Sequence, residues 1–178
     1  MNQSLISSRY AKALMKTGIG SNCLEALKND MDLLSATISK NPMFKIILNN
    51  PVIKPQQKRN VMGILLEKRV HPLTLNFINL IIHNRRERLL ADITRNFITS
   101  YDKSKGIKQA HVVSAISMDE PAKKQLQHHL NRMFQADVKM TNETNPELIG
   151  GFNLRVDDQQ YDASMSSALK RMRKTLAV

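Results

Sequence analysis

The chain has 178 residues, which fits one domain or two small ones of about 100 residues each. Its composition, 42% hydrophobic and 24% charged, is globular, and the single cysteine, Cys23, excludes an internal disulfide framework and suits a reducing compartment. The longest apolar stretch, around residues 73–82, is too short to span a bilayer, and the N-terminus lacks the apolar core of a secretion signal, so we expect a cytosolic chain unless it docks on something larger.

The net charge of +12 is unevenly distributed along the chain. Residues 1–105 hold 17 Lys and Arg against 7 Asp and Glu, a net charge of +10, whereas the remainder holds 10 against 8, a net charge of +2. A basic half can bind nucleic acid, an anionic membrane surface or an acidic protein. Its simplest interpretation is a set of solvated helix faces.

Apolar residues at helical spacing predict a helical domain over residues 1–105. The first helix covers residues 5–17 and ends at Gly18 and Gly20, after which Ser21 or Asn22 caps the second helix. The apolar positions of the second helix step by 3 and 4 residues, which indicates a bundle seam too short for a free-standing coiled coil. These positions are Leu24, Leu27, Met31, Leu34 and Ile38.

Prolines open the third, fourth and fifth predicted helices, at positions 42, 55 and 72. We expect the fourth helix to direct Val61, Ile64 and Leu65 inward. The fifth is hydrophobic nearly all round, so it either lies at the centre of its bundle or covers a partner. A sixth begins near Arg86 and completes a six-helix bundle.

Residues 103–106 are the predicted domain boundary, because polarity rises there, Gly106 appears and the apolar period changes from 3.6 to about 2. Residues 110–116 are typical of a strand, and Asp119 caps a helix with Pro121 in its first turn. Strands and a last helix follow, which gives the order β-α-β-β-(β)-α over residues 106–178. We therefore predict an α+β protein: an N-terminal six-helix bundle followed by a small C-terminal mixed β-sheet/helix domain.

The segment from residue 136 to residue 174 is the most informative part of the chain. Phe152, Leu154 and Val156 alternate with polar residues, which is the period of a half-buried strand, and residues 157 and 158, both aspartate, suit a tight turn. Asp162 or Ser164 then caps a helix. The apolar residues of that helix fall at spacings of 4, 3 and 4, at Met165, Leu169, Met172 and Leu176.

This segment resembles the signature of the delta subunit of F-type ATP synthases, known in mitochondria as the oligomycin-sensitivity-conferring protein. The matching residues are Pro146, Leu148, Ile149, Gly150, Gly151, Arg155, Val156, Asp158, Asp162, Ser164, Leu169 and Arg173. Asp157 and Ala163 stand where the family usually has glycine. Weaker similarity covers residues 9–14, 50–53 and 76–84, and after Asn84 the family often has a glycine where this chain has Arg85. Without that glycine, either Asn84 adopts the left-handed conformation between the fifth and sixth helices, or these two helices bend without a left-handed turn.

The resemblance implies a non-catalytic stator subunit of the proton-translocating ATP synthase, which links the catalytic head to the peripheral stalk so that rotor torque drives ATP synthesis. It implies that residues 1–105 bind the N-terminal helix of an alpha subunit and that residues 106–178 bind the b subunits of the stalk. It also implies one copy per complex, a monomer when isolated, no cofactor, and a peripheral location at the cytoplasmic face of the bacterial inner membrane, held there through the complex.

By position, the resemblance places the alpha-subunit groove between the first and fifth helices, at Tyr10, Ala13, Leu14, Phe77, Leu80 and Ile81. These six side chains could instead only pack the two helices together. The candidates for the stalk contact are the cations Lys170, Arg171, Arg173 and Lys174. Their alternative role is favourable placement of positive charge near a helix C-terminus.

Residue spacing offers no catalytic, metal or nucleotide site: the adjacent His128 and His129 point about 100° apart on a helix, and no phosphate-binding glycine motif occurs. The alternative function is a basic nucleic-acid-binding module, motivated by the pI of about 10.0 and the basic cluster at residues 85–88. Aromatic content of only 4%, with no Trp, argues against a base-stacking surface. Tight DNA binding with a steep salt dependence would favour this alternative.

Overall fold

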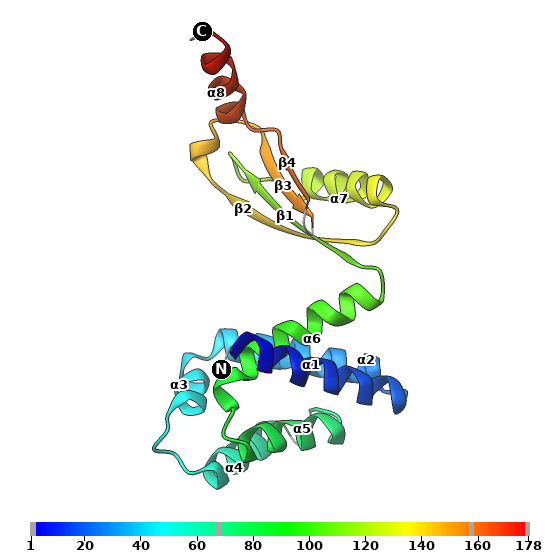
Figure 1. Cartoon of the computed structure of the whole chain (residues 1–178), viewed down its shortest axis with the longest axis vertical. Helices are drawn as coiled ribbons and strands as arrows, with labels where there is room; N and C mark the ends of the chain where they lie inside the picture. The colour runs from blue at the N-terminus through cyan, green and yellow to red at the C-terminus, as the bar shows by residue number, and fades with distance from the viewer. Residues whose placement is uncertain (1–2, 67–68, 157–158, 177–178) are drawn as a thin grey trace. The chain divides into compact units, whose positions relative to one another are not determined.

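The computed structural model describes residues 3–66, 69–156 and 159–176, with side chains described up to residue 173. It divides into two compact units, Met1–Tyr101 and Asp102–Val178. The boundary predicted from the sequence lies four residues further along, at Gly106. The helical part contains α1 (Gln3–Gly20), α2 (Leu24–Lys40), α3 (Pro42–Asn49), α4 (Pro55–Leu66), α5 (Pro72–His83), the 3-10 helix η1 (Glu87–Leu89) and α6 (Leu90–Ser104) (Figure 1).

One apolar core holds the helical unit together. The seam predicted on α2 is confirmed, since Leu27, Met31 and Leu34 are buried and the two outer positions, Leu24 and Ile38, pack against the core. α5 adds Phe77, Ile78, Ile81 and Ile82 to this core, and α6 adds Leu90, Ile93, Phe97 and Tyr101. The hydrophobic composition of α5 is thus explained largely by a central place in the bundle.

The inward face of α4 differs from the prediction. Ile64 is 85% exposed and Leu65 is 45% exposed, whereas Met62 and Leu66 are buried together with Lys58. The Lys58 ammonium donates to the Leu48 carbonyl oxygen over 2.8 Å and forms an ion pair with Glu87. A buried lysine is tolerated because its charge is paired and hydrogen-bonded. The apolar pattern does not reveal this pairing, so it selected a face of α4 that contains the exposed Ile64 and Leu65 instead of the face with Lys58.

The connection from α1 to α2 also differs from the prediction, because neither Ser21 nor Asn22 caps α2. The N-cap residue is Cys23, without a side-chain hydrogen bond. Asn22 instead has a φ of 51° and terminates α1: its N–H donates to the Ile19 carbonyl, and the Cys23 N–H donates to the Gly18 carbonyl. This pair of bonds is the Schellman motif, which uses a left-handed residue directly after a helix.

The same motif ends α5, with Arg85 as the left-handed residue at a φ of 53°. The Arg85 N–H donates to Ile82 and the Arg86 N–H donates to Ile81, each over 3.0 Å. Asn84 has a φ of −79°, so the alternative that placed Asn84 in the left-handed turn is wrong. Arginine occupies a conformation that glycine adopts without strain.

Replacing Arg85 by glycine should therefore stabilise the helical unit. Relief of the left-handed strain is worth about 1–2 kcal/mol, and the greater entropy of glycine in the unfolded chain offsets about half of that, which leaves a gain of about 0.5–1 kcal/mol. Urea unfolding of the wild type and Arg85→Gly measures the difference. Arg88→Gly, which removes a neighbouring positive charge within η1, is the control and should destabilise. A loss of stability in Arg85→Gly would contradict the strain.

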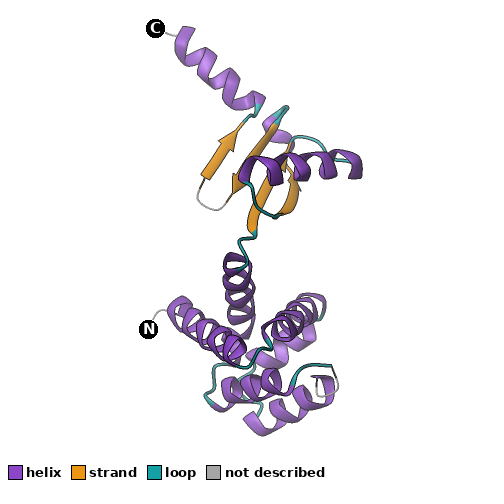
Figure 2. Cartoon of the chain, turned by 90° about the vertical axis from the view of Figure 1, so that its right-hand side faces the viewer, coloured by secondary structure: helices purple, strands orange, loops and turns teal. Residues whose placement is uncertain are grey.

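The C-terminal unit is built on a four-stranded sheet in the order β2-β1-β3-β4. The elements are β1 (Lys108–Ser114), α7 (Glu120–Phe134), β2 (Val138–Thr144), the 3-10 helix η2 (Pro146–Leu148), β3 (Phe152–Val156), β4 (Gln159–Asp162) and α8 (Met165–Leu176). β1 and β2 are parallel, as a crossover through α7 requires, and the other two pairs are antiparallel. Figure 2 shows α7 lying against one face of the sheet.

The core of this unit lies between the sheet and α7. Ala110, Val112, Val138, Leu154 and Val156 of the sheet pack with Leu130 of α7. The alternation predicted for residues 152–156 is confirmed, because Leu154 and Val156 are buried and Arg155 between them is exposed. Asp119 is the N-cap of α7, as predicted, and its carboxylate accepts from the Ala122 N–H over 3.0 Å.

The predicted α+β class is confirmed, with a helical N-terminal part and a mixed four-stranded sheet in the C-terminal part. The count of six helices in the bundle stays a prediction. Residues 67 and 68 lie outside the described residues, and η1 precedes α6 where a single sixth helix was predicted near Arg86.

Candidate partner-binding surfaces

The six residues predicted to form a groove divide into two groups. Leu14, Phe77 and Ile81 are buried in the core of the helical unit. Tyr10 is half-buried, Ala13 is exposed, and Leu80 is 49% exposed. The first three are therefore part of the packed core, and the second three reach the surface.

Contacts at Tyr10 bring the edges of α1 and α5 together. Its ring meets Phe77 edge-on with centroids 6.2 Å apart, and its hydroxyl accepts from the Asn84 side-chain amide over 3.1 Å. Ala13 lies three residues after Tyr10 on α1, and Leu80 lies three residues after Phe77 on α5. At this spacing, each residue lies on the same side of its helix as the aromatic residue before it. Ala13 and Leu80 thus present small and large apolar side chains on the surface beside this junction.

Buried polar contacts fix the positions of both helices. On α1, the buried Ser7 hydroxyl accepts from the Asn96 amide over 3.0 Å, which ties α1 to α6. At the start of α5, the buried Asp30 carboxylate of α2 accepts from the His71 N–H over 2.9 Å and from the Thr74 hydroxyl. A carboxylate at this end is also favoured by the helix dipole. The α1–α5 surface is therefore held by the rest of the bundle.

In the C-terminal unit, the two glycines of the predicted family motif attach α8 to the sheet. A Cβ at Gly151, whose φ is 76°, would lie 2.2 Å from the Ala163 carbonyl oxygen, and one at Gly150 would lie 3.0 Å from Met165 Cγ. The Met165 N–H donates to the Gly150 carbonyl over 2.9 Å, and the Ala163 N–H donates to the Phe152 carbonyl over 3.0 Å. Because these glycines have no side chain, their backbone directly contacts the first residue of α8 and the residues just before it.

Asp162 and Ser164 organise the first turn of α8, as predicted. The Asp162 carboxylate accepts from the Ser167 hydroxyl over 2.6 Å and from the hydroxyl and N–H of Ser164 over 2.7 and 2.9 Å. The Ser164 hydroxyl in turn accepts from the Ser167 N–H over 3.3 Å, which is the N-cap bond. These bonds, that from Ser167 foremost, lower the pKa of Asp162 from 3.8 to about 2.

Acid should weaken this turn. Because the folded pKa of Asp162 lies below the unfolded value of 3.8, ionised Asp162 stabilises the folded state above about pH 4, and this contribution is lost as the pH falls towards 2. Between pH 5 and 2, the melting temperature of the wild type should fall further than that of Asp162→Asn, in which the titrating group is absent. An NMR titration of the Asp162 carboxyl provides the direct check, and a midpoint near 4 would contradict the bonding described.

The remaining motif residues have structural places too. Pro146 begins η2, where the Asn145 side chain accepts from the Glu147 N–H. Arg155 is exposed on β3. Asp158, predicted in the tight turn with Asp157, lies outside the described residues. Ile149 has a φ of 66°, an uncommon conformation for a β-branched residue, and its side chain is 68% exposed.

α8 leaves the end of the sheet and extends away from it (Figures 1 and 2). Met165, Leu169 and Met172 share one face of α8 and are 54%, 45% and 60% exposed. The predicted stalk residues Lys170, Arg171 and Arg173 are exposed on the same helix, and the side chain of Lys174 lies outside those described. Sequence reasoning noted the spacing of these apolar residues and selected only the cations as candidates for the stalk contact. The spacing of 4 and 3 was the signal for the stripe, but spacing alone does not distinguish a buried face from an exposed one.

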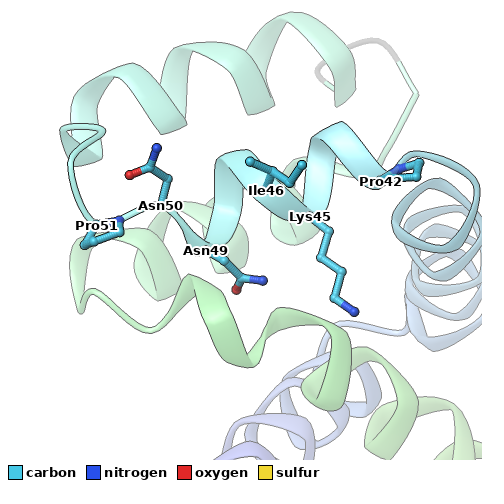
Figure 3. A pocket seen from close by; sticks show the side chains of 6 residues that line it. All are labelled: Pro42, Lys45, Ile46, Asn49, Asn50 and Pro51. Carbon is cyan, nitrogen blue, oxygen red and sulfur yellow. The ribbon is translucent and has the colours of Figure 1, made fainter.

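A further apolar surface on α3 has no counterpart in the predicted site. An open hollow of about 580 Å³ is lined by Pro42, Lys45, Ile46, Asn49, Asn50 and Pro51 (Figure 3). Ile46 is 59% exposed, and the neighbouring Met43 is 68% exposed. Most of the lining residues belong to one short helix, so the hollow lacks the convergent polar groups that small-molecule sites use.

Within the described residues, no group of three or more His, Cys, Asp or Glu side chains is arranged to hold a metal ion. No helix in the same part of the chain is long and apolar enough to cross a membrane.

The chain is similar over nearly its whole length to subunits of ATP synthases. "ATP synthase subunit delta" of Desulfitobacterium hafniense is 30% identical over 177 residues, with 99% of each chain covered. The protein of the same name from Parabacteroides distasonis is 32% identical over 176 residues, covering 99% of this chain and 98% of the relative. A chain in the mitochondrial ATP synthase hexamer of Toxoplasma gondii has the same fold, with a TM-score of 0.81 at 21% identity over 97% of both chains.

These relatives place the chain among the subunits of ATP synthases. The family model "ATP synthase delta (OSCP) subunit" matches residues 6–176, so the chain belongs to the ATP synthase delta (OSCP) subunit family. The predicted family and function are confirmed: the chain is a structural, non-catalytic stator component of the ATP synthase peripheral stalk. The alternative of a nucleic-acid-binding module is not supported by these relatives.

Proposed function

We propose that this chain joins the catalytic head of the ATP synthase to the peripheral stalk through two separate helix-binding surfaces. The α1–α5 surface binds the N-terminal helix of an alpha subunit, and the α8 end of the C-terminal unit binds the b subunits. A link of this kind prevents the head from turning with the rotor, so that torque is used for ATP synthesis. One copy per complex, monomeric when isolated, is sufficient for this task.

The observation that carries the first contact is the exposure of Ala13 and Leu80 beside the place where Tyr10 of α1 contacts Phe77 of α5. A small residue allows a partner helix to approach α1 closely, and a large apolar residue on α5 supplies area to bury. For the second contact, the support is the exposed stripe Met165, Leu169 and Met172 with Lys170 and Arg173 on the same helix. Apolar burial gives the affinity in this mode of recognition, and charged residues at the edge set the register.

The complex would hold the chain at the cytoplasmic face of the bacterial inner membrane as a peripheral component. A stator must resist torque without dissociating, so its contact with the head should have nanomolar affinity, about 12 kcal/mol, and a slow off-rate.

Affinity purification of the tagged chain from native membranes tests this function. Alpha, beta and b subunits should be recovered together. Loss of residues 165–178 should remove b while leaving alpha and beta, because the two surfaces lie in different units. Recovery of none of these subunits with the full-length chain would overturn the proposal.

A further inference from the structure

The two helices that border the proposed groove have an uneven charge. α1 contains Arg9, Lys12 and Lys16 but no aspartate or glutamate, and α5 contains no acidic residue, lysine or arginine. Acidic residues of the helical unit lie on other helices, such as Asp30 and Asp32 on α2. A helix lying along α1 and α5 would therefore meet only positive or neutral side chains from these two helices.

Two of the cations border Ala13 on the exposed side of α1. Arg9 precedes Ala13 by four residues and Lys16 follows it by three, and both spacings place side chains on one face of a helix. All three residues are exposed. The ion pairs found among the described residues of the helical unit use other cations, namely Lys28, Lys58 and Arg95.

Positive charge also lies at the end of the surface where α5 terminates. The Arg86 guanidinium carbon is 5.7 Å from the centroid of the Tyr10 ring, and Arg85 next to it is exposed. Tyr10 itself joins α1 to Phe77 of α5. The apolar surface residues Ala13 and Leu80 thus have cations along the α1 edge and at one end.

We propose that the α1–α5 surface selects a partner helix that is acidic along one edge, with two carboxylates seven residues apart that meet Arg9 and Lys16. Arg9 and Lys16 are themselves seven residues apart, which is about 10.5 Å along a helix, and residues at this spacing share a face. A partner helix that lies along α1, whether parallel or antiparallel, can pair with both cations only if its two carboxylates are also seven residues apart. The proposal rests on the proposed function and specifies the chemistry of the alpha-subunit helix.

A protein helix fits this surface better than a nucleic acid, because exposed apolar residues lie next to the cations. Ala13 lies between Arg9 and Lys16, and Leu80 is 49% exposed. A partner with both an apolar stripe and an acidic edge uses all of these residues. A phosphate backbone would use the cations and leave the apolar residues uncovered.

Surface plasmon resonance with the full chain and the catalytic head lacking its own delta subunit tests the proposal. Exposed ion pairs contribute little each, so Arg9→Gln combined with Lys16→Gln should weaken binding about tenfold at low salt. Screening should reduce this difference to less than about twofold at 0.5 M salt. The control, Lys40→Gln combined with Lys45→Gln, removes the same charge from exposed positions on α2 and α3 and should bind like the wild type.

A second probe is the synthetic N-terminal peptide of the alpha subunit, compared with a version in which glutamine replaces its acidic residues. The neutral peptide should bind the wild type as weakly as the acidic peptide binds the double variant. Equal binding of both peptides, together with loss of binding in Ala13→Asp, would overturn the acidic edge and leave the proposed function intact. Failure of the wild type to bind the head would overturn both. Competition by duplex DNA that depends on Arg9 and Lys16 would assign the cations to nucleic acid and overturn the inference.

Discussion

Replacing Ala13 by aspartate is expected to abolish binding to the catalytic head while leaving the chain folded. Ala13 is exposed in the isolated chain, so the new carboxylate stays solvated there. In the complex, the carboxylate would be pressed against the apolar stripe of the partner helix and lose its water. Pairing it with Arg9 or Lys16, at spacings of four and three residues, would withdraw these cations from the acidic edge of the partner. A central contact of this kind costs about 3–4 kcal/mol, which weakens binding by more than about a hundredfold.

The control for this variant is Ala36→Asp, which places the same residue at an exposed position of α2. Both substitutions carry the same penalty of about 0.5 kcal/mol in helix propensity, so circular dichroism and melting temperature should change equally. Only Ala13→Asp should fail to assemble, as measured by copurification with alpha and beta subunits. Leu80→Asp is expected to fail in the same way from the opposite side of the groove. Normal assembly of both groove variants would remove the groove assignment.

Gly151→Ala is expected to have the largest effect on stability. The added Cβ would lie 2.2 Å from the Ala163 carbonyl oxygen and 3.3 Å from Ser164 Cα, and both are backbone atoms that cannot rotate aside. The φ of 76° adds the strain of a left-handed alanine. Together, overpacking and strain should cost about 3–4 kcal/mol, a large part of the stability of a small unit. Chemical unfolding followed by NMR signals of β3 and β4 measures the loss.

Gly106→Ala separates the two causes. Gly106 has a φ of 72°, close to that of Gly151, but no atom within 4 Å of the added Cβ. Its substitution should cost only the conformational strain, about 1 kcal/mol. If the two alanine variants lost equal stability, the contact between Gly151 and Ala163 would not constrain the start of α8.

The features that could be predicted from the sequence are those with one dominant local cause. The seam of α2 follows from apolar spacing alone, and the cap at Asp119 follows from an acidic residue with a proline two positions later. The strand at residues 152–156 alternates because one face of the sheet meets α7 and the other does not. In each of these, local pattern and tertiary packing favour the same structure.

The mispredicted features have causes that an apolar pattern does not contain, either a partner far along the chain or a specific set of backbone hydrogen bonds. Lys58 is buried because Glu87, 29 residues later, and the Leu48 carbonyl satisfy its charge, and no local pattern contains that information. Arg85 takes the left-handed conformation because the bonds of a Schellman motif outweigh its strain. At the candidate α1–α5 surface, the sequence does not separate buried from exposed positions, since Leu14, Phe77 and Ile81 share the apolar character of the half-exposed Leu80.

The way in which α8 is joined to the sheet has a consequence for how the proposed stalk contact can change. The helix is joined to the sheet by main-chain hydrogen bonds at Gly150 and Phe152 and by a first turn that involves Asp162, Ser164 and Ser167. Of the three exposed apolar residues of α8, Met165 lies at this joint, whereas Leu169 and Met172 lie beyond it. Exchange of Leu169 and Met172 for the residues of another species should therefore redirect the proposed stalk contact without refolding the unit, so that α8 would act as an exchangeable adaptor on a fixed base.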